Sequence, residues 1–169
     1  LEPPMGSILH LHQIPKVGGD TMFASMYHAY EQLSDPIKSF ISNLSAWHES
    51  IGVHRDRLNH KGTLRDGENA YPEALHPIVR THPETGKKSL YIGNHSSHIV
   101  DMALEEGEAI LADLETHATQ QDLIYRHKWQ IDDVLMWDNR CTMHCVEPYD
   151  AAKEKRSVHR VVVRGDAPV

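Results

Sequence analysis

Apolar and polar residues alternate over residues 7 to 14, SILHLHQI, as they do in a half-buried β-strand. The glycine-containing stretch PKVGGDT then predicts a turn, and Asp20 or Thr21 can cap a helix that follows it. A second helix is predicted to begin at Ser34, where a capping residue precedes an early proline. The apolar positions that predict a buried face on these helices are Phe23, Met26, Tyr27 and Tyr30 on the first, and Ile37, Phe40, Ile41 and Leu44 on the second.

The rest of the chain predicts one long loop, one further helix and several short strands. Residues 48–75 are polar and rich in glycine, which is typical of a functional loop, and we expect an active-site loop or lid there. Two short strands are predicted around the PETG turn within 76–93, and a helix over 101–117 with Leu104, Leu111 and Leu114 inward. Four strand-like runs follow: LIYRHKW, DDVLMWDN, CTMHCV and SVHRVVVRG. Helices clustered early and strands late predict a single α+β domain over 1–169.

Composition narrows the classes of partner. The chain has 169 residues, 40% of them hydrophobic, and 17 Lys and Arg against 24 Asp and Glu give a net charge of −7. No basic block stands out, so we expect neither nucleic acid nor an anionic membrane as a partner. No apolar stretch approaches the roughly 20 residues that a membrane span needs. With only two cysteines and no signal-peptide pattern, a reducing, cytoplasmic location is predicted.

Fourteen histidines are the most unusual feature of the composition. Most are expected to be surface or hydrogen-bonded residues, and seven lie on amphipathic or polar segments with no evident partner: His10, His12, His28, His54, His60, His117 and His127. The pair His95 and His98 is three residues apart on an irregular segment, which is weak evidence for a metal site. For each of these histidines the structural interpretation is favoured over the ligand interpretation.

His144, in CTMHC, allows a sharper hypothesis. A structural zinc site needs four ligands, whereas this run offers three, and strand alternation would place Cys141 and Cys145 on the face opposite His144. His144 could instead be one arm of a two-histidine, one-carboxylate iron site. Arg156 and Arg160, about 13 Å apart on one face of a strand, could then hold the carboxylates of a co-substrate. Two solvated surface arginines explain the same spacing equally well.

Four stretches taken together resemble one known family. GGDT (18–21), HPIVRTHPETGKKSLYI (76–92), WDNRCTMH (137–144) and RSVHRVVVRGDAP (156–168) occur in the order found in the taurine / 2,4-dichlorophenoxyacetate dioxygenase (TauD/TfdA) family. That family consists of Fe(II)- and 2-oxoglutarate-dependent oxygenases with a double-stranded β-helix (jelly-roll) core and flanking helices. IGNHSSHI and YRHKWQIDDVLMWDNRC look closer to the phenoxyacetate branch than to the taurine branch.

The resemblance implies a role for four residues. His144 matches the distal iron-binding histidine, and Thr21 matches a threonine that contacts 2-oxoglutarate. Arg156 matches the arginine that pairs with the far carboxylate of 2-oxoglutarate, and Arg160 matches the arginine that meets the anionic group of the primary substrate. The family's other two ligands, a His-X-Asp pair, are expected before Leu1, together with the N-terminal part of the fold.

The implied activity is hydroxylation of a small organic anion, aryloxyalkanoate-like, with 2-oxoglutarate and O2 converted to succinate and CO2. A sulfonate substrate of the taurine type is the alternative within this class. The alternative from another class is a non-catalytic, carboxylate-binding homologue that lacks the iron ligands. We further expect a homo-oligomer.

Overall fold

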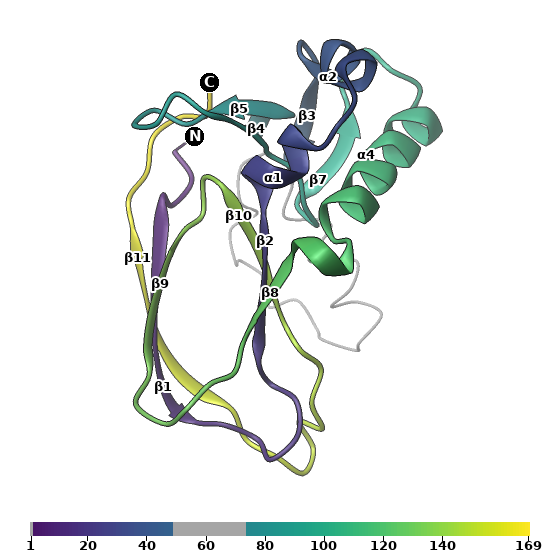
Figure 1. Ribbon diagram of the computed structural model, residues 1–169. Coiled ribbons are helices and arrows are strands. Elements are labelled where there is room, and N and C mark those ends of the chain that lie inside the picture. Colours follow the sequence, from purple (N-terminus) through teal and green to yellow (C-terminus); the bar gives the residue numbers. More distant parts are fainter. Residues whose placement is uncertain (1, 49–73) are drawn as a thin grey trace, which may run out of the picture.

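A computed structural model describes residues 2–48 and 74–169, and two three-stranded antiparallel sheets form one part of it (Figure 1). The first sheet has the order β11 (Ser157–Val163), β1 (Gly6–Gln13), β9 (Val134–Asp138), and the second the order β10 (Thr142–Val146), β2 (Thr21–Ser25), β8 (Ile124–His127). Along the chain, the connections from β1 to β2, β8 to β9, β9 to β10 and β10 to β11 each pass from one sheet to the other. The strands predicted over 7–14 and in the last third of the chain are thus confirmed.

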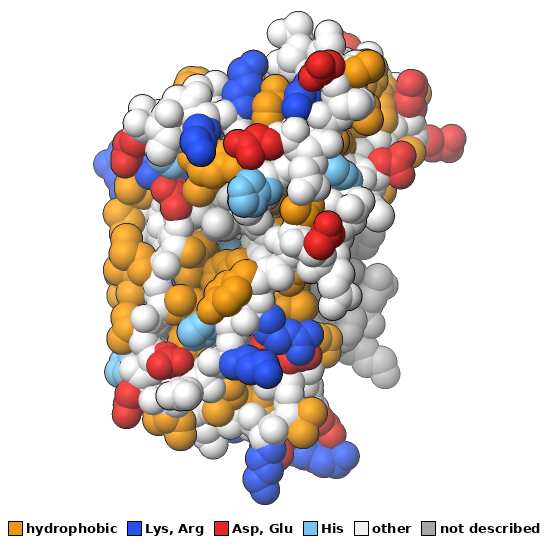
Figure 2. Space-filling model, viewed as in Figure 1, with side chains coloured by type: hydrophobic (Ala, Val, Ile, Leu, Met, Phe, Trp, Pro, Cys, Tyr) orange, Lys and Arg blue, Asp and Glu red, His pale blue; other side chains and the backbone are white. Residues whose placement is uncertain are grey.

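The two sheets enclose a small apolar core. Leu9 and Leu11 alternate with outward-facing residues along β1 and are buried together with Trp129 and Trp137. Phe23, from the second sheet, packs against this cluster. The outer face of the first sheet carries apolar side chains that remain exposed, and Figure 2 shows hydrophobic side chains along that side of the molecule. The most exposed of them are Val134, Met136 and Val161.

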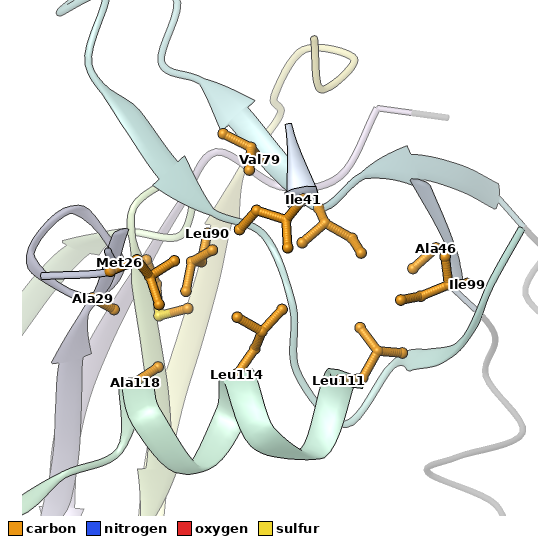
Figure 3. Close-up of a cluster of buried hydrophobic side chains, with 12 residues drawn as sticks. Met26, Ala29, Ile41, Ala46, Val79, Leu90, Ile99, Leu111, Leu114 and Ala118 are labelled. Atoms are coloured by element: carbon orange, nitrogen blue, oxygen red, sulfur yellow. The ribbon is translucent and has the colours of Figure 1, made fainter. Parts of the chain in front are cut away.

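A second, larger core lies among the remaining helices and strands (Figure 3). These elements are α1 (Met26–Glu31), α2 (Asp35–Ile41), β3 (Ser45–His48), β4 (Ala74–Pro77), β5 (Val79–Thr81), β6 (Lys88–Leu90), β7 (Ser96–Ile99), α4 (Leu104–Ala118) and the 3-10 helix η1 (Gln121–Leu123). β4, β3 and β7 form a three-stranded sheet, and β5 and β6 form a hairpin. Leu111 and Leu114 on α4 point into the core toward Ile41 and Leu90.

The first helix is shorter than its apolar spacing predicts. Residues 21–25 form strand β2, hydrogen-bonded to β8 and β10, and α1 begins only at Met26, where the Ser25 hydroxyl accepts from the His28 amide. The expected cap at Asp20 or Thr21 is therefore wrong. Phe23 faces the core between the sheets while Met26 faces the second core, so the apolar residues of this segment do not share one helical face.

Three apolar helix positions predicted to be inward are exposed. On α2, Ile37 and Phe40 are 43% and 53% exposed, whereas Ile41 is buried as expected. On α4, Leu104 is 57% exposed, because it lies in the first turn beyond the edge of the core. These helices bury a narrower stripe than the pattern suggests.

The loop predicted over 48–75 is shorter at both ends, because its first residue and its last two belong to strands. His48 ends β3 and Ala74 begins β4, and these two strands pair with each other. The remaining residues, 49–73, lie outside the described part of the chain, so the expectation of a lid is not tested. Among the described residues, no helix is long and apolar enough to span a membrane.

Candidate functional site

Strand β10 places His144 between the two sheets. His144 lies directly opposite Phe23 in the β10–β2 register, and their ring centres are 6.1 Å apart. The Trp137 ring of the opposite sheet lies 4.8 Å from the His144 ring. The two rings flank the imidazole, and His144 itself remains exposed, so its nitrogens can reach a ligand in the intersheet space.

A pocket of about 500 Å³ opens beside His144. Its wall includes Arg160 and extends to His95 and the Gly93–Asn94 segment before β7. Arg160 Nη2 donates to the buried Ser7 hydroxyl at 3.3 Å, which fixes the arginine against β1. Burial lowers the pKa of His144, and the nearby Arg160 charge lowers it further. The His144 imidazole is therefore neutral at neutral pH and has a lone pair for a metal.

Thr21 and Arg156 meet at a second point on the same side of the β10–β2–β8 sheet. The fully buried Thr21 hydroxyl accepts from Trp129 Nε1 at 2.9 Å and from Arg156 Nη2 at 3.3 Å. Arg156 Nε donates to the Gly19 carbonyl at 2.8 Å, and the guanidinium lies 5.8 Å from the centre of the Trp129 ring. These two hydrogen bonds use two of the five N–H donors of a guanidinium, so donors remain for a bound carboxylate.

The Gly18–Gly19 turn shapes this corner. Both residues have positive φ, 75° and 80°, a left-handed conformation that glycine adopts at little cost. A Cβ atom on Gly18 would lie 2.2 Å from the Pro148 carbonyl oxygen, and one on Gly19 would lie 2.6 Å from a Pro15 ring carbon. The turn therefore needs both glycines to bring the Gly19 carbonyl and Thr21 beside the arginine.

Neither candidate arginine has an acidic partner in the described ranges. Arg80, Arg126, Arg140 and Arg164 all form ion pairs with carboxylates. Within residues 2–48 and 74–169, by contrast, no carboxylate lies within 4.0 Å of the guanidinium of Arg156 or Arg160. Two unpaired cations that line one intersheet space are suited to bind anions.

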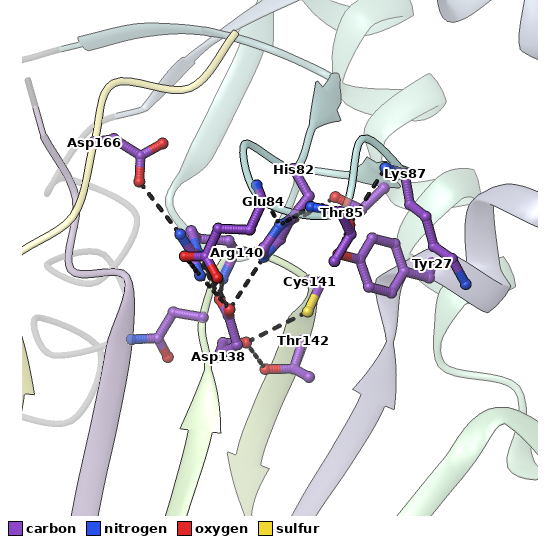
Figure 4. Close-up of polar contacts among 12 residues, drawn as sticks. Tyr27, His82, Glu84, Thr85, Lys87, Asp138, Arg140, Cys141, Thr142 and Asp166 are labelled. Carbon is purple, nitrogen blue, oxygen red and sulfur yellow. Dashed lines mark hydrogen bonds and ion pairs between the residues drawn. The ribbon is translucent and has the colours of Figure 1, made fainter.

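A network of charged residues determines where β10 begins (Figure 4). Arg140, with 5% of its side chain exposed, donates to both carboxylate oxygens of Asp138 at 2.7 to 3.1 Å. Nε2 of the buried His82 lies 3.1 Å from Asp138 Oδ2. Arg140 also reaches Glu84 at 3.0 Å and Asp166 at 3.6 Å. The turn between β9 and β10 is thus tied to the β5–β6 hairpin and to the C-terminal segment.

Asn139 ties the same turn to β1. Its side-chain amide donates to the Ser7 hydroxyl at 3.0 Å, and its backbone amide donates to the Met5 carbonyl at 2.8 Å. The side-chain oxygen Oδ1 of Asn139 in turn accepts from Trp137 Nε1 at 2.7 Å. The WDNR sequence therefore positions His144, which follows it on β10, relative to both sheets.

This network makes part of the stability acid-sensitive. Burial by itself raises the pKa of Asp138, but the hydrogen bonds from Arg140 and His82 outweigh it and lower the pKa to about 2 from 3.8. A carboxyl whose pKa is lower in the folded state stabilises that state above its unfolded pKa. The stabilisation is lost as pH falls from about 4 through about 2, and is on the order of 1–2 kcal/mol after allowing for solvent screening.

Replacing Asp138 by asparagine tests this account. We expect Asp138→Asn to lower the free energy of unfolding near pH 7 by about 1–3 kcal/mol, because the buried Arg140 loses its charged partner. The deficit relative to wild type should shrink as pH falls from about 4 to 2. Urea unfolding of wild type and Asp138→Asn between pH 2 and pH 7 measures this difference in the free energy of unfolding. The variant Asp113→Asn, which changes an exposed aspartate on α4, is the control. A deficit that does not change with pH would contradict the assigned role.

The four residues implied by the resemblance lie around one intersheet space, in two pairs. Thr21 contacts Arg156, and His144 shares a pocket wall with Arg160. Sequence reasoning missed Trp129, which touches both members of the first pair, and the Asp138–Arg140 network. The signal for the Asp138–Arg140 network was the run of polar residues after Trp137, which local patterns could not connect to His82. Trp129 carried no comparable signal.

Several of the histidines expected to be surface or hydrogen-bonded residues have partners that the local sequence does not show. His117 Nε2 donates to the Ala29 carbonyl at 2.8 Å, and His127 Nε2 lies 3.4 Å from an Asp133 carboxylate oxygen. His10 and His12 contact Asp132 and His159. These partners come from other helices, strands and connections, which local sequence patterns cannot identify.

Among the described residues, His144 belongs to no group of three potential metal ligands that converge. Two groups of potential ligand atoms converge, His10 with His12 and Asp132, and His82 with Asp138 and Cys141, and neither group includes His144. The Asp138 carboxylate is already engaged by Arg140. Cys141 precedes β10 and Cys145 is exposed, and both are free thiols. An iron ion held by His144 and two more protein ligands therefore needs at least one of them from outside residues 2–48 and 74–169.

One His-X-Asp sequence occurs within the chain, at His54-Arg55-Asp56. It lies in 49–73, outside the described residues. It also follows Thr21, whereas the resemblance places the ligand pair before Pro3-Pro4. The order along the chain therefore argues against it as the ligand pair.

Comparison with known proteins agrees with this arrangement. The model of the taurine catabolism dioxygenase TauD, TfdA family matches residues 1–162. The α-ketoglutarate-dependent 2,4-dichlorophenoxyacetate dioxygenase of Cupriavidus pinatubonensis is 38% identical over 163 residues, 96% of this chain and 56% of that protein. The (S)-phenoxypropionate/α-ketoglutarate-dioxygenase of Sphingobium herbicidovorans is 37% identical over 167 residues, 95% of this chain and 58% of that protein.

A solved structure is similar over nearly the whole chain. The crystal structure of AAD-2 in complex with Mn(II) and N-oxalylglycine superimposes with a TM-score of 0.88 at 37% identity, covering 99% of this chain and 66% of that one. The chain spans somewhat more than half the length of the curated relatives it matches. With a family match over residues 1–162 and the intersheet arrangement described above, the chain belongs to the taurine catabolism dioxygenase TauD, TfdA family.

Proposed function

We propose that the intact protein is an Fe(II)- and 2-oxoglutarate-dependent dioxygenase that hydroxylates a small organic anion. The substrate and 2-oxoglutarate each take one oxygen atom from O2, so the products are an alcohol, succinate and CO2. The observation that carries this proposal is the pair of arginines without carboxylate partners, Arg156 and Arg160, beside a neutral intersheet histidine, His144. One anion site suits the co-substrate, and the other suits the substrate.

The proposal includes the fold of the whole domain. The six strands that alternate between two sheets are proposed as part of a double-stranded β-helix, and 1–169 as the C-terminal portion of one such domain. β10 is an edge strand among the described residues, so a further strand can pair with it. The segment before Leu1 is the proposed source of that strand and of the remaining iron ligands.

Arg156 and Thr21 are proposed to hold the far carboxylate of 2-oxoglutarate. Arg156 is fixed by the Gly19 carbonyl and stacks on Trp129, so little side-chain freedom remains to be lost on binding. Phe23 lies opposite His144 in the β10–β2 register. Thr21 lies two residues before Phe23 on β2, so it is about 7 Å along the strand from Phe23. A short dicarboxylate can therefore bridge the arginine and the metal position.

His144 is proposed to contribute one ligand to Fe(II), which when bound would supply the activation of O2. Phe23 and Trp137 pack on the imidazole and limit its rotation. Arg160 is proposed to hold the anionic group of the substrate in the pocket beside His144, which orients the substrate carbon toward the metal.

An aryloxyalkanoate-like anion is the proposed substrate class, and a sulfonate is the alternative. The pocket combines one guanidinium with apolar wall residues such as Phe23 and Ile92, which suits an aromatic or alkyl body with a charged end. A homo-oligomer and a cytoplasmic location also stay predictions.

The requirement for metal and oxygen tests the activity. The intact protein should release succinate from 2-oxoglutarate only when Fe(II) and O2 are both present, and faster with an aryloxyalkanoate than with taurine. Succinate and hydroxylated product are measured together by chromatography after chelation, after anaerobic incubation and in the complete mixture. Turnover that survives metal removal would overturn the dioxygenase proposal. Binding of 2-oxoglutarate with no turnover under any condition would favour the carboxylate-binding alternative.

A further inference from the structure

Three histidines and an aspartate gather on the outer face of the β11–β1–β9 sheet, away from His144. His10 and His12 lie two residues apart on β1, so both side chains point to the same face. His159 on β11 lies directly opposite His10 in the register. Asp132 lies in the connection between β8 and β9. Three chain segments therefore contribute to one surface cluster.

The side-chain atoms in this cluster are close enough to share an ion. Ligand atoms of His10, His12 and Asp132 all lie within 4.8 Å of one another. His10 Nε2 is 3.6 Å from Asp132 Oδ1. Two ligand atoms on a tetrahedral Zn²⁺ are about 3.3 Å apart. Small rotations of the side chains are therefore enough to bring the three ligand atoms to the distances that one ion requires.

His159 has a different place in the cluster. Its Nδ1 lies 3.0 Å from His12 Nε2, within hydrogen-bond distance, and the two rings meet edge to face with centres 4.3 Å apart. This contact engages Nε2 of His12 and leaves Nδ1 for a metal. Metal-binding histidines commonly have their second nitrogen held by such a partner, which sets the tautomer and the ring orientation.

The backbone around the cluster is held in place. The Asp132 amide donates to the Leu11 carbonyl at 2.9 Å, and the Leu11 amide donates to the Asp133 carbonyl at 3.0 Å, so the turn is tied to β1. Asp132 has a positive φ of 71°, a conformation that aspartate tolerates better than most residues. The carboxylate is therefore presented beside His10 by a fixed turn.

We propose that His10, His12 and Asp132 form a second metal site for a divalent transition ion, with His159 as the partner that orients His12. Two imidazoles and a carboxylate suit Zn²⁺, Ni²⁺ or Cu²⁺ better than Mg²⁺ or Ca²⁺, which prefer all-oxygen ligand sets. Water or an external ligand completes the coordination, since the site is open to solvent. This site is independent of the proposed iron site, because its side chains point away from the intersheet space.

Counting bound zinc in a matched set of variants tests the proposal. The intact wild-type protein, dialysed against buffered Zn²⁺ and analysed for metal, should bind one equivalent more than His12→Ala. His10→Ala and Asp132→Asn should lose the same equivalent. His159→Ala should keep the site but bind zinc about 10- to 100-fold more weakly, as expected for a partner outside the coordination sphere. The exposed His28→Ala, on α1, is the matched control and should behave as wild type.

The proposed iron site is separated from this one by repeating the count in a His144→Ala background. His144→Ala should still bind the equivalent of zinc that is assigned to His10, His12 and Asp132. The His144→Ala, His12→Ala double variant should not bind it. The paramagnetic resonance spectrum of bound Cu²⁺ should also show nitrogen coupling that His12→Ala reduces. Equal zinc binding by wild type and His12→Ala, or loss of the equivalent with His144→Ala alone, would overturn the proposal. A complete loss with His159→Ala would overturn the assignment of the three ligands.

Discussion

His144→Ala should abolish succinate formation coupled to substrate hydroxylation and should remove bound iron from the intact protein. The proposed metal site has two histidine arms and one carboxylate, so loss of one arm leaves two protein ligands and a weakly held ion. The imidazole is also the residue around which Phe23 and Trp137 pack, so alanine opens space without adding a donor. Iron content and succinate release are measured on the same sample.

Two further variants make this result specific. His95→Ala changes another histidine of the same pocket wall and should retain iron, which separates a lost ligand from a disturbed pocket. His28→Ala changes an exposed histidine and should match wild type in both measurements. Thermal unfolding of all three variants shows whether they remain folded. Full iron content and activity in a folded His144→Ala would reduce His144 to a structural strand residue.

Arg156→Ala and Arg160→Ala should impair different steps. Arg156 contacts Thr21 and Gly19, so its loss should raise the Michaelis constant for 2-oxoglutarate and affect the primary substrate less. Arg160 shares the pocket with His144, so its loss should raise the Michaelis constant for the substrate anion and leave uncoupled 2-oxoglutarate decarboxylation running. A charge-assisted contact in a partly dry pocket contributes about 1.5–3 kcal/mol, roughly a tenfold to hundredfold change in affinity.

The conservative variant Arg156→Lys should recover only part of the loss. Lysine keeps the positive charge, but its ammonium cannot reproduce the planar fork that reaches the Gly19 carbonyl and a carboxylate together. Arg164→Ala, which breaks an exposed ion pair with Glu2, is the matched control and should change either constant by no more than about twofold. Steady-state kinetics with each substrate varied separately measures all four variants. Equal, small effects at positions 156 and 160 would indicate two solvated arginines.

Local pattern was sufficient to predict several elements. The alternation over 7–14 predicted β1, and Ser34-Asp35-Pro36 predicted the start of α2, because a strand face and a helix cap depend on residues next to one another. The helix over 101–117 was predicted within three residues of α4 at its start and one at its end. The assignment of Thr21, His144, Arg156 and Arg160 to one site came from the resemblance and not from any local pattern, and their roles stay a prediction.

The tertiary structure decided what depends on distant partners. Phe23 and Met26 share a helical spacing, but pairing with β8 and β10 draws residues 21–25 into a strand that ends where the second core begins. The sequence alone left open whether Arg156 and Arg160 are solvated. In the fold Arg156 is half-buried against Thr21, whereas Arg160 lines the His144 pocket and remains exposed.

The same distinction applies to the polar clusters. His82 and Asp138 are 56 residues apart, and they meet where the turn after β5 lies against the end of β9. His12 and His159 meet because β1 and β11, from opposite ends of the chain, pair with each other. A sequence pattern records which faces can be buried, since that depends on the period of a strand or helix. Which side chains then meet across a sheet depends on strand order and register, and these are set by the packing of the whole domain.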